Sequence, residues 1–234
     1  MSLPKLTVPT YELNLISNDK TIQYRPFLVR EEKLLLMALE SKDKKEIIKN
    51  IYTVLTNCVL SKGININEMA SFDVEYIFLK IREKSMGETI EVLVQCPETK
   101  KTFESILNLS DVQIEKSEKL SNKIEITDNL GLILKYPSFM MMQEHGDLKQ
   151  SDKIFNMIIN CIDKIYDKDT IYEAKDYTKK ELEEFLENLP QNAFTKINEF
   201  FKNFPKIMYE KDVVSPYTNK TVKVRLDSFI DFFG

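Results

Sequence analysis

The chain has 234 residues, of which 43% are hydrophobic and 30% charged, a balance typical of a globular protein and not of a disordered one. Its net charge of −4 disfavours a nucleic-acid-binding protein, because that class needs a basic face. The 5 glycines include neither G-x-G-x-x-G nor G-x-x-x-x-G-K, which disfavours a phosphate-binding loop.

The first 87 residues predict a β-hairpin followed by helices. Two alternating runs flank the turn-forming segment Ser17–Lys20, and the second run leads directly into strong helix formers. Asp43 is suited to cap the next helix, and Gly63 to end it in the left-handed conformation. The expected elements are strands within 5–15 and 21–28 and helices over 29–40, 44–63 and 71–87.

Between residues 88 and 136 the hydrophobic period changes from helical to alternating, which predicts strands. The segment 110–122 is charged and is interpreted as a loop, and Asp128-Asn129 predicts a corner. The expected strands lie over 90–95, 102–109, 123–127 and 131–136.

The C-terminal segment, 137–234, predicts helices and a terminal hairpin. Phe139–His145 is read as a short helix or turn, and Thr178–Glu181 as a capping box. Pro190 separates two helices. The other expected elements are a helix carrying the apolar stripe Ile154, Phe155, Ile158, Ile162 and Ile165, a polar connection over 167–176, a helix that Pro205 stops, and strands over 207–214 and 221–226.

These elements predict an α+β fold. It has an N-terminal β-hairpin with helices (1–87), a central β-rich segment (88–136) and C-terminal helices with a terminal hairpin (137–234). The three segments form one compact domain or two closely packed ones.

Cytoplasmic residence is expected, because no apolar run approaches the ~18–20 residues that cross a bilayer and the N-terminus lacks the apolar core of a signal peptide. The 3 cysteines, Cys58, Cys96 and Cys161, make no even framework for disulfides, so reduced and buried thiols are expected.

The two predicted hairpins at 90–109 and 207–226 share a sequence pattern. Residues 96–107 align without a gap with residues 215–226, and Pro, Thr, Lys, Thr and the final Leu recur in place. Two tight turns with convergent chemistry explain this, and so do two copies of a knuckle hairpin of the kind built around zinc. Zinc needs about four Cys or His ligands. With 3 Cys and 1 His scattered along the chain, we predict no metal site. If the turns are knuckles, Thr hydroxyls and the backbone hydrogen bonds of each turn must close them.

No catalytic residue or cofactor site is predicted. His145, the only histidine, would need an orienting carboxylate or a nucleophile nearby, and the sequence indicates none. Glu183 and Glu184 are neighbours on a helix and point in different directions. The charged run Lys42–Lys49 alternates in sign, as the polar side of an amphipathic helix does.

Apolar side chains supply the candidate interaction site. Met140–Met142 suit core filling or an adaptable contact surface. The chain end carries four large apolar residues that either fold back on the core or insert into a partner. These four candidate interaction residues are Phe229, Ile230, Phe232 and Phe233.

Two blocks near the start, Leu6–Leu13 and Tyr24–Ala38, resemble the beginning of the T4-type bacteriophage baseplate hub proteins. Several members of that family carry cysteines in a knuckle where this chain has Ser215 and Thr218, so the resemblance implies no metal here. The resemblance continues in Tyr136-Pro137, in 184–190, in 197–206 and in the terminal hairpin around 215–220.

The resemblance implies a structural or assembly protein of the central hub of a contractile-tail baseplate, with no reaction and no cofactor. It implies synthesis in the host cytoplasm and, for a subunit, a place in the virion tail. The expected partners are other phage baseplate hub proteins, with no nucleic acid and no membrane; self-association and copy number stay open. Three alternatives remain: a hub assembly factor absent from the mature virion, a small hydrolase using His145 and a carboxylate, and a single-stranded nucleic-acid-binding module that uses its aromatic side chains.

Overall fold

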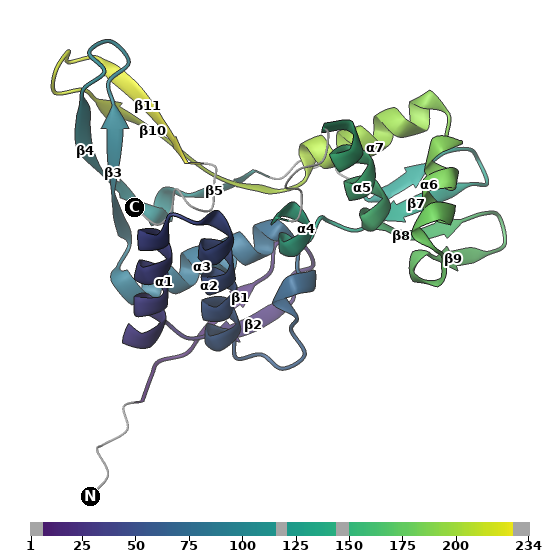
Figure 1. Cartoon of the computed structure of the whole chain (residues 1–234), viewed down its shortest axis with the longest axis horizontal. Coiled ribbons are helices and arrows are strands. Elements are labelled where there is room, and N and C mark those ends of the chain that lie inside the picture. The colour runs from purple at the N-terminus through teal and green to yellow at the C-terminus, as the bar shows by residue number, and fades with distance from the viewer. Residues whose placement is uncertain (1–6, 116–120, 144–149, 227–234) are drawn as a thin grey trace, which may run out of the picture. The chain divides into compact units, whose positions relative to one another are not determined.

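The computed structural model describes residues 7–115, 121–143 and 150–226 and shows an α+β fold, as predicted (Figure 1). Two compact units divide the chain. Unit 1 comprises residues up to Ile66, Phe72–Glu115 and the residues from Lys206 onward. Unit 2 comprises Asn67–Ser71 and Lys116–Pro205.

Unit 1 begins with the predicted hairpin and three helices. Tyr11 pairs with Tyr24 and Asn14 with Thr21, and Asp43 caps the second helix by accepting from the Lys45 N–H at 2.9 Å. The elements are β1 (Tyr11–Asn14), β2 (Thr21–Tyr24), α1 (Val29–Ser41), α2 (Lys44–Cys58), the 3-10 turn η1 (Ile66–Glu68), which continues into unit 2, and α3 (Ser71–Met86).

The second helix ends at Cys58, so the prediction that it continues to Gly63 is wrong. Val59 leaves the helix to form a bridge with Tyr24 of β2, and the Arg25 N–H donates to the Cys58 carbonyl at 2.9 Å. Pairing with a strand distant in sequence therefore overrides the local end signal. Gly63 does adopt a left-handed conformation, with φ +75°, in the following turn.

Two antiparallel hairpins complete unit 1. The first pairs β3 (Thr89–Gln95) with β4 (Thr102–Asn108); the second pairs β10 (Lys206–Val214) with β11 (Thr221–Leu226). We call these four strands and their two turns the double hairpin. Its inner side chains form one apolar cluster that includes Leu107, Ile207 and Tyr209.

The predicted loop over 110–122 is wrong over its first half, because Leu109–Asp111 form a 3-10 turn (η2) and Gln113–Glu115 form strand β5. This strand pairs with the start of β10, where Ile114 lies opposite Ile207 and Glu115 opposite Lys206. Nothing local in a charged segment signals a strand of this kind, since its ladder partner lies far along the chain.

Unit 2 holds an antiparallel sheet in the order β6-β7-β8-β9. The apolar sides of its helices and strands share one core, which includes Leu132, Ile158, Ile197 and Phe200. The elements are β6 (Lys123–Glu125), β7 (Gly131–Leu134), α4 (Phe139–Gln143), α5 (Gln150–Cys161), β8 (Ile162–Tyr166), β9 (Ile171–Glu173), the 3-10 turn η3 (Ala174–Asp176), α6 (Lys179–Glu187) and α7 (Gln191–Asn203).

Two predictions are wrong in unit 2, because strand pairing extends over segments that were expected to be a helix and a loop. The helix expected to reach Ile165 ends at Cys161, and Ile162–Tyr166 form β8, which pairs with β7. The expected polar connection over 167–176 contains β9, which pairs with β8. Ile162 and Ile165 fit the helical stripe equally well, so periodicity alone does not separate the two states. The capping box is confirmed, because the Thr178 N–H donates to Glu181 Oε2 at 2.7 Å.

Candidate functional site: the double hairpin

The two turns of the double hairpin have the same backbone structure, as their alignment suggests. In Cys96–Lys101 and in Ser215–Lys220 the first N–H donates to the sixth carbonyl and the fifth N–H to the first carbonyl, all at 2.9 Å. The fifth residue is left-handed in both, with φ +59° at Lys100 and +52° at Asn219.

A third turn shares this geometry. Leu15–Lys20 makes the same two hydrogen bonds at 3.0 Å, with φ +55° at Asp19. The fourth side chain accepts from the sixth N–H in all three turns, at 3.0 Å for Asn18 and at 3.4 Å for Thr99 and Thr218. Common turn chemistry therefore explains the backbone geometry that the three turns share. The Thr99 and Thr218 hydroxyls help to close the two turns of the double hairpin, as expected.

The two turns of the double hairpin lie side by side (Figure 1), and side-chain contacts between them distinguish this pair from the third turn. Lys220 Nζ lies 2.6 Å from Glu98 Oε1, and the Tyr217 hydroxyl donates to the Thr102 carbonyl at 2.7 Å. The Tyr217 ring also lies 5.5 Å from Lys101 Nζ. Segments more than a hundred residues apart in sequence are thus joined at their tips.

The first and fourth positions of the two turns gather around one thiol. Cys96 and Ser215 are buried, and Cys96 Sγ lies 4.0 Å from Thr218 Oγ1. Hydrogen bonds from the Ser215 and Thr99 side chains, and from the Thr99 and Glu98 N–H groups, lower the pKa of Cys96 to about 6. A zinc knuckle has its ligands at the first and fourth positions of each turn. Here the side chains at those positions interact with one another through hydrogen bonds. Within the described ranges, no group of three or more His, Cys, Asp or Glu is placed to hold a metal ion.

The other predicted candidates are not brought to this site. His145 and the four apolar residues Phe229, Ile230, Phe232 and Phe233 lie outside the described residues. Glu183 and Glu184 are exposed on α6, and Met140 and Met141 are half-buried in α4. No helix of the described residues is long and apolar enough to cross a bilayer.

The outer face of β3–β4 carries an apolar pair that the sequence analysis did not single out. Leu93 is 74% exposed and Ile106 63%. Leu93 lies opposite Glu104 and Ile106 opposite Glu91, so the two apolar side chains are diagonal neighbours between carboxylates. The available signal was an apolar residue at each of two outward positions of otherwise polar alternation.

The sequence was compared with models of known protein families. The family described as T4 bacteriophage base plate protein matches residues 8–234, nearly the whole length. The chain belongs to this family. No curated protein and no solved structure matches it. The matched range contains unit 2, the double hairpin and all of unit 1 from residue 8 onward, so the family assignment covers the fold described above.

Proposed function

We propose that this base plate protein is a structural component of the central hub of a contractile tail, and that it acts by binding other hub proteins and not by catalysis. The observation that carries the proposal is the family match over residues 8–234. The resemblance of Leu6–Leu13 and Tyr24–Ala38 to hub proteins supports the more specific role.

The outer face of β3–β4 is the contact surface that we propose for a hub partner. Exposed large apolar side chains beside polar ones are the usual composition of such a surface. The sheet is two-stranded, so each strand has an edge that pairs with no further strand of the described residues. Glu91 and Glu104 flank the apolar pair, and their charge favours a partner with a basic rim.

The tied turns make this surface suitable for assembly. The two hairpins share one buried apolar cluster and are joined at their turns by the Lys220–Glu98 ion pair and the Tyr217–Thr102 hydrogen bond, so we expect β3–β4 to be well ordered before a partner binds. A surface that is already ordered loses less conformational entropy when a partner binds.

The test is co-purification of hub proteins with the tagged full chain from infected cells. The variant L93T/I106T places β-branched side chains at both strand positions but shortens the apolar contact, so recovery of hub proteins should fall about tenfold. The matched control is I171T, because Ile171 is 64% exposed on β9 in unit 2. Unchanged recovery with L93T/I106T, or an equal loss with I171T, would count against the surface.

Mass spectrometry of purified virions separates a hub subunit from an assembly factor. A stoichiometric amount of the chain supports the subunit that we propose. If hub proteins co-purify with the chain from infected cells but virions lack it, the assembly factor is the correct role.

A further inference from the structure

The outward face of α1 is unusually apolar for a helix face that contacts solvent. Its residues are Val29, Lys33, Leu36, Met37 and Glu40, which follow the spacing i, i+4, i+7, i+8, i+11 of one face. Val29, Leu36 and Met37 are 80%, 54% and 52% exposed. We call these five residues the α1 outer face.

The other side of α1 already supplies the contacts that hold the helix in unit 1. Glu31, Leu35 and Ala38 are buried there. Single exposed apolar residues need no explanation, but three on one face make a second apolar stripe, which the described part of the chain leaves exposed.

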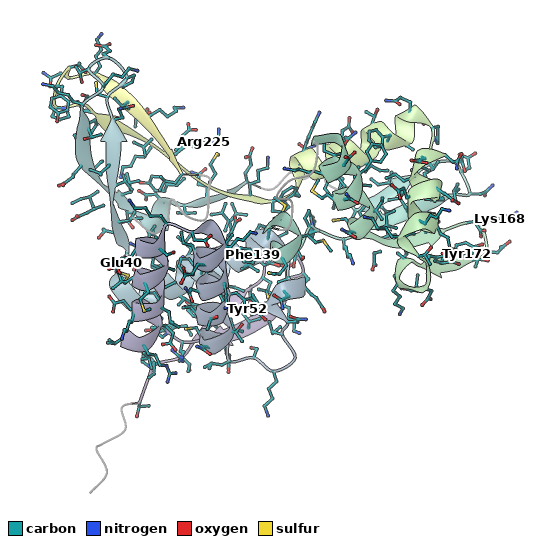
Figure 2. The ribbon with its side chains drawn as sticks, viewed as in Figure 1. Glu40, Tyr52, Phe139, Lys168, Tyr172 and Arg225 are labelled. Atoms are coloured by element: carbon teal, nitrogen blue, oxygen red, sulfur yellow. The ribbon has the colours of Figure 1, made fainter. Side chains whose placement is uncertain are left out.

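The charges on the α1 outer face are arranged symmetrically. Lys33 and Glu40 are seven positions apart, which is about 10.5 Å along a helix, and Leu36 and Met37 lie midway between them. Among the residues whose side chains the structure describes, which exclude Lys44, none forms an ion pair with Lys33 or Glu40. Glu40, labelled in Figure 2, lies in the last turn of α1.

This arrangement is complementary to itself when reversed. If a second α1 lies antiparallel, with the twofold axis between Leu36 and Met37, Lys33 faces Glu40 of the partner subunit, and the same pair repeats on the other side of the axis. Leu36 then packs against Met37 of the partner subunit. A parallel arrangement in register would instead place like charges opposite each other.

We propose that two copies of this chain associate through their α1 outer faces in this antiparallel register. An interface made by one helix face of each subunit buries less surface area than the interface of a permanent dimer, so we expect the association to be weak and to depend on concentration. The proposal is independent of the hub role, since it concerns a different surface and needs no other protein.

The experiment is sedimentation equilibrium of the purified full chain over a wide concentration range. The single reversals K33E and E40K each turn two attractive pairs into repulsive ones and should raise the dimer dissociation constant about tenfold. The double reversal K33E/E40K restores both pairs and should restore the wild-type constant. L36S/M37S should leave only monomer.

The matched control is K168E, which reverses an exposed charge in unit 2 and should change nothing (Figure 2). Circular dichroism of each variant verifies that the helices are retained. A wild-type chain that stays monomeric throughout, or a double reversal no better than the single ones, overturns the proposal. Dimers seen only after truncation beyond Leu226 overturn it as well, because the removed residues would then be what covers the face.

Discussion

Cys96 differs from the other two thiols in its electrostatic surroundings. Burial raises the pKa of Cys58 to about 11 and that of Cys161 to about 12, whereas hydrogen bonds from the turns lower the pKa of Cys96 to about 6. Near neutral pH we therefore expect one thiolate, at the point where the two turns meet.

Replacing Ser215 by Ala removes the leading hydrogen bond to that thiolate, so the pKa of Cys96 should rise. Thiolate absorbance near 240 nm, followed against pH, measures the change, and the variant C96S identifies the absorbing group. The Cys96 thiol loses its proton at a lower pH in the native state than in the unfolded chain. Wild-type stability should therefore rise relative to C96S between about pH 6 and pH 9. A step near pH 6 that persists in C96S contradicts the assignment.

Glu31 is a buried carboxylate at the start of α1. Its Oε1 lies 3.0 Å from Arg25 Nη2 and 2.7 Å from Arg30 Nε, and its Oε2 accepts from the Leu28 N–H at 2.8 Å. Burial by itself would raise the pKa of Glu31, but these hydrogen bonds outweigh it and lower the pKa to about 2.

Because E31Q would leave Arg25 buried without its counter-charge, it should reduce the free energy of unfolding by roughly 3–5 kcal/mol. Urea denaturation measures this, with E32Q, one position along, as the control. The folded-state pKa is depressed, so the contribution is complete above the unfolded-state value and is lost as pH falls from about 4.5 towards 2. Equal effects of E31Q and E32Q would rule out the buried pair as the cause.

At the scale of the element, Gly131 shows how closely the strands of unit 2 approach. A Cβ at this position would lie 2.7 Å from the Ile124 carbonyl oxygen and would clash with the Tyr166 hydroxyl. The backbone oxygen belongs to β6, and Glu125 of that strand pairs with Gly131 itself, so neither strand can move aside without loss of the ladder.

Gly131→Ala should therefore destabilise the protein by roughly 1–3 kcal/mol, although Ala normally suits a strand better than Gly. Thermal unfolding measures the loss. The matched control is N129A in the neighbouring exposed corner, which should change little. If G131A melts at the wild-type temperature, the strands are not packed this closely.

At the scale of the whole molecule, unit 2 is almost entirely a single continuous insertion in unit 1. The chain leaves unit 1 after Glu115 and returns at Lys206. These two residues are register partners in the β5–β10 pair, so the ends of the insertion are adjacent.

A chain in which a short Gly/Ser turn replaces residues 116–205 should therefore still fold as unit 1. The Cys96 thiolate step near pH 6 is a specific reporter, because it requires both turns of the double hairpin to meet. Cooperative unfolding together with that step is the expected result. Loss of the step would mean that unit 1 depends on unit 2.

Local patterns predicted the elements whose signals are confined to neighbouring residues. The Thr178 capping box, the Asp43 cap and the matching turns at 96–101 and 215–220 each depend on side chains a few positions apart. The strands over 113–115 and 162–166 were missed because ladder partners distant in sequence select the strand state. The apolar pair Leu93 and Ile106 was missed because exposure depends on what covers a strand.

By itself, the sequence determined the α+β class, the turn chemistry, the counted shortage of metal ligands and the resemblance that the family match confirms at the level of the base plate family. These properties depend on residue type and short spacing. Only the tertiary structure decided that the two turns meet around Cys96, that unit 2 interrupts a strand pair, and which apolar side chains stay uncovered. Each of these three properties depends on which segments distant in sequence pack together. Local sequence patterns do not indicate the free energy of such packing.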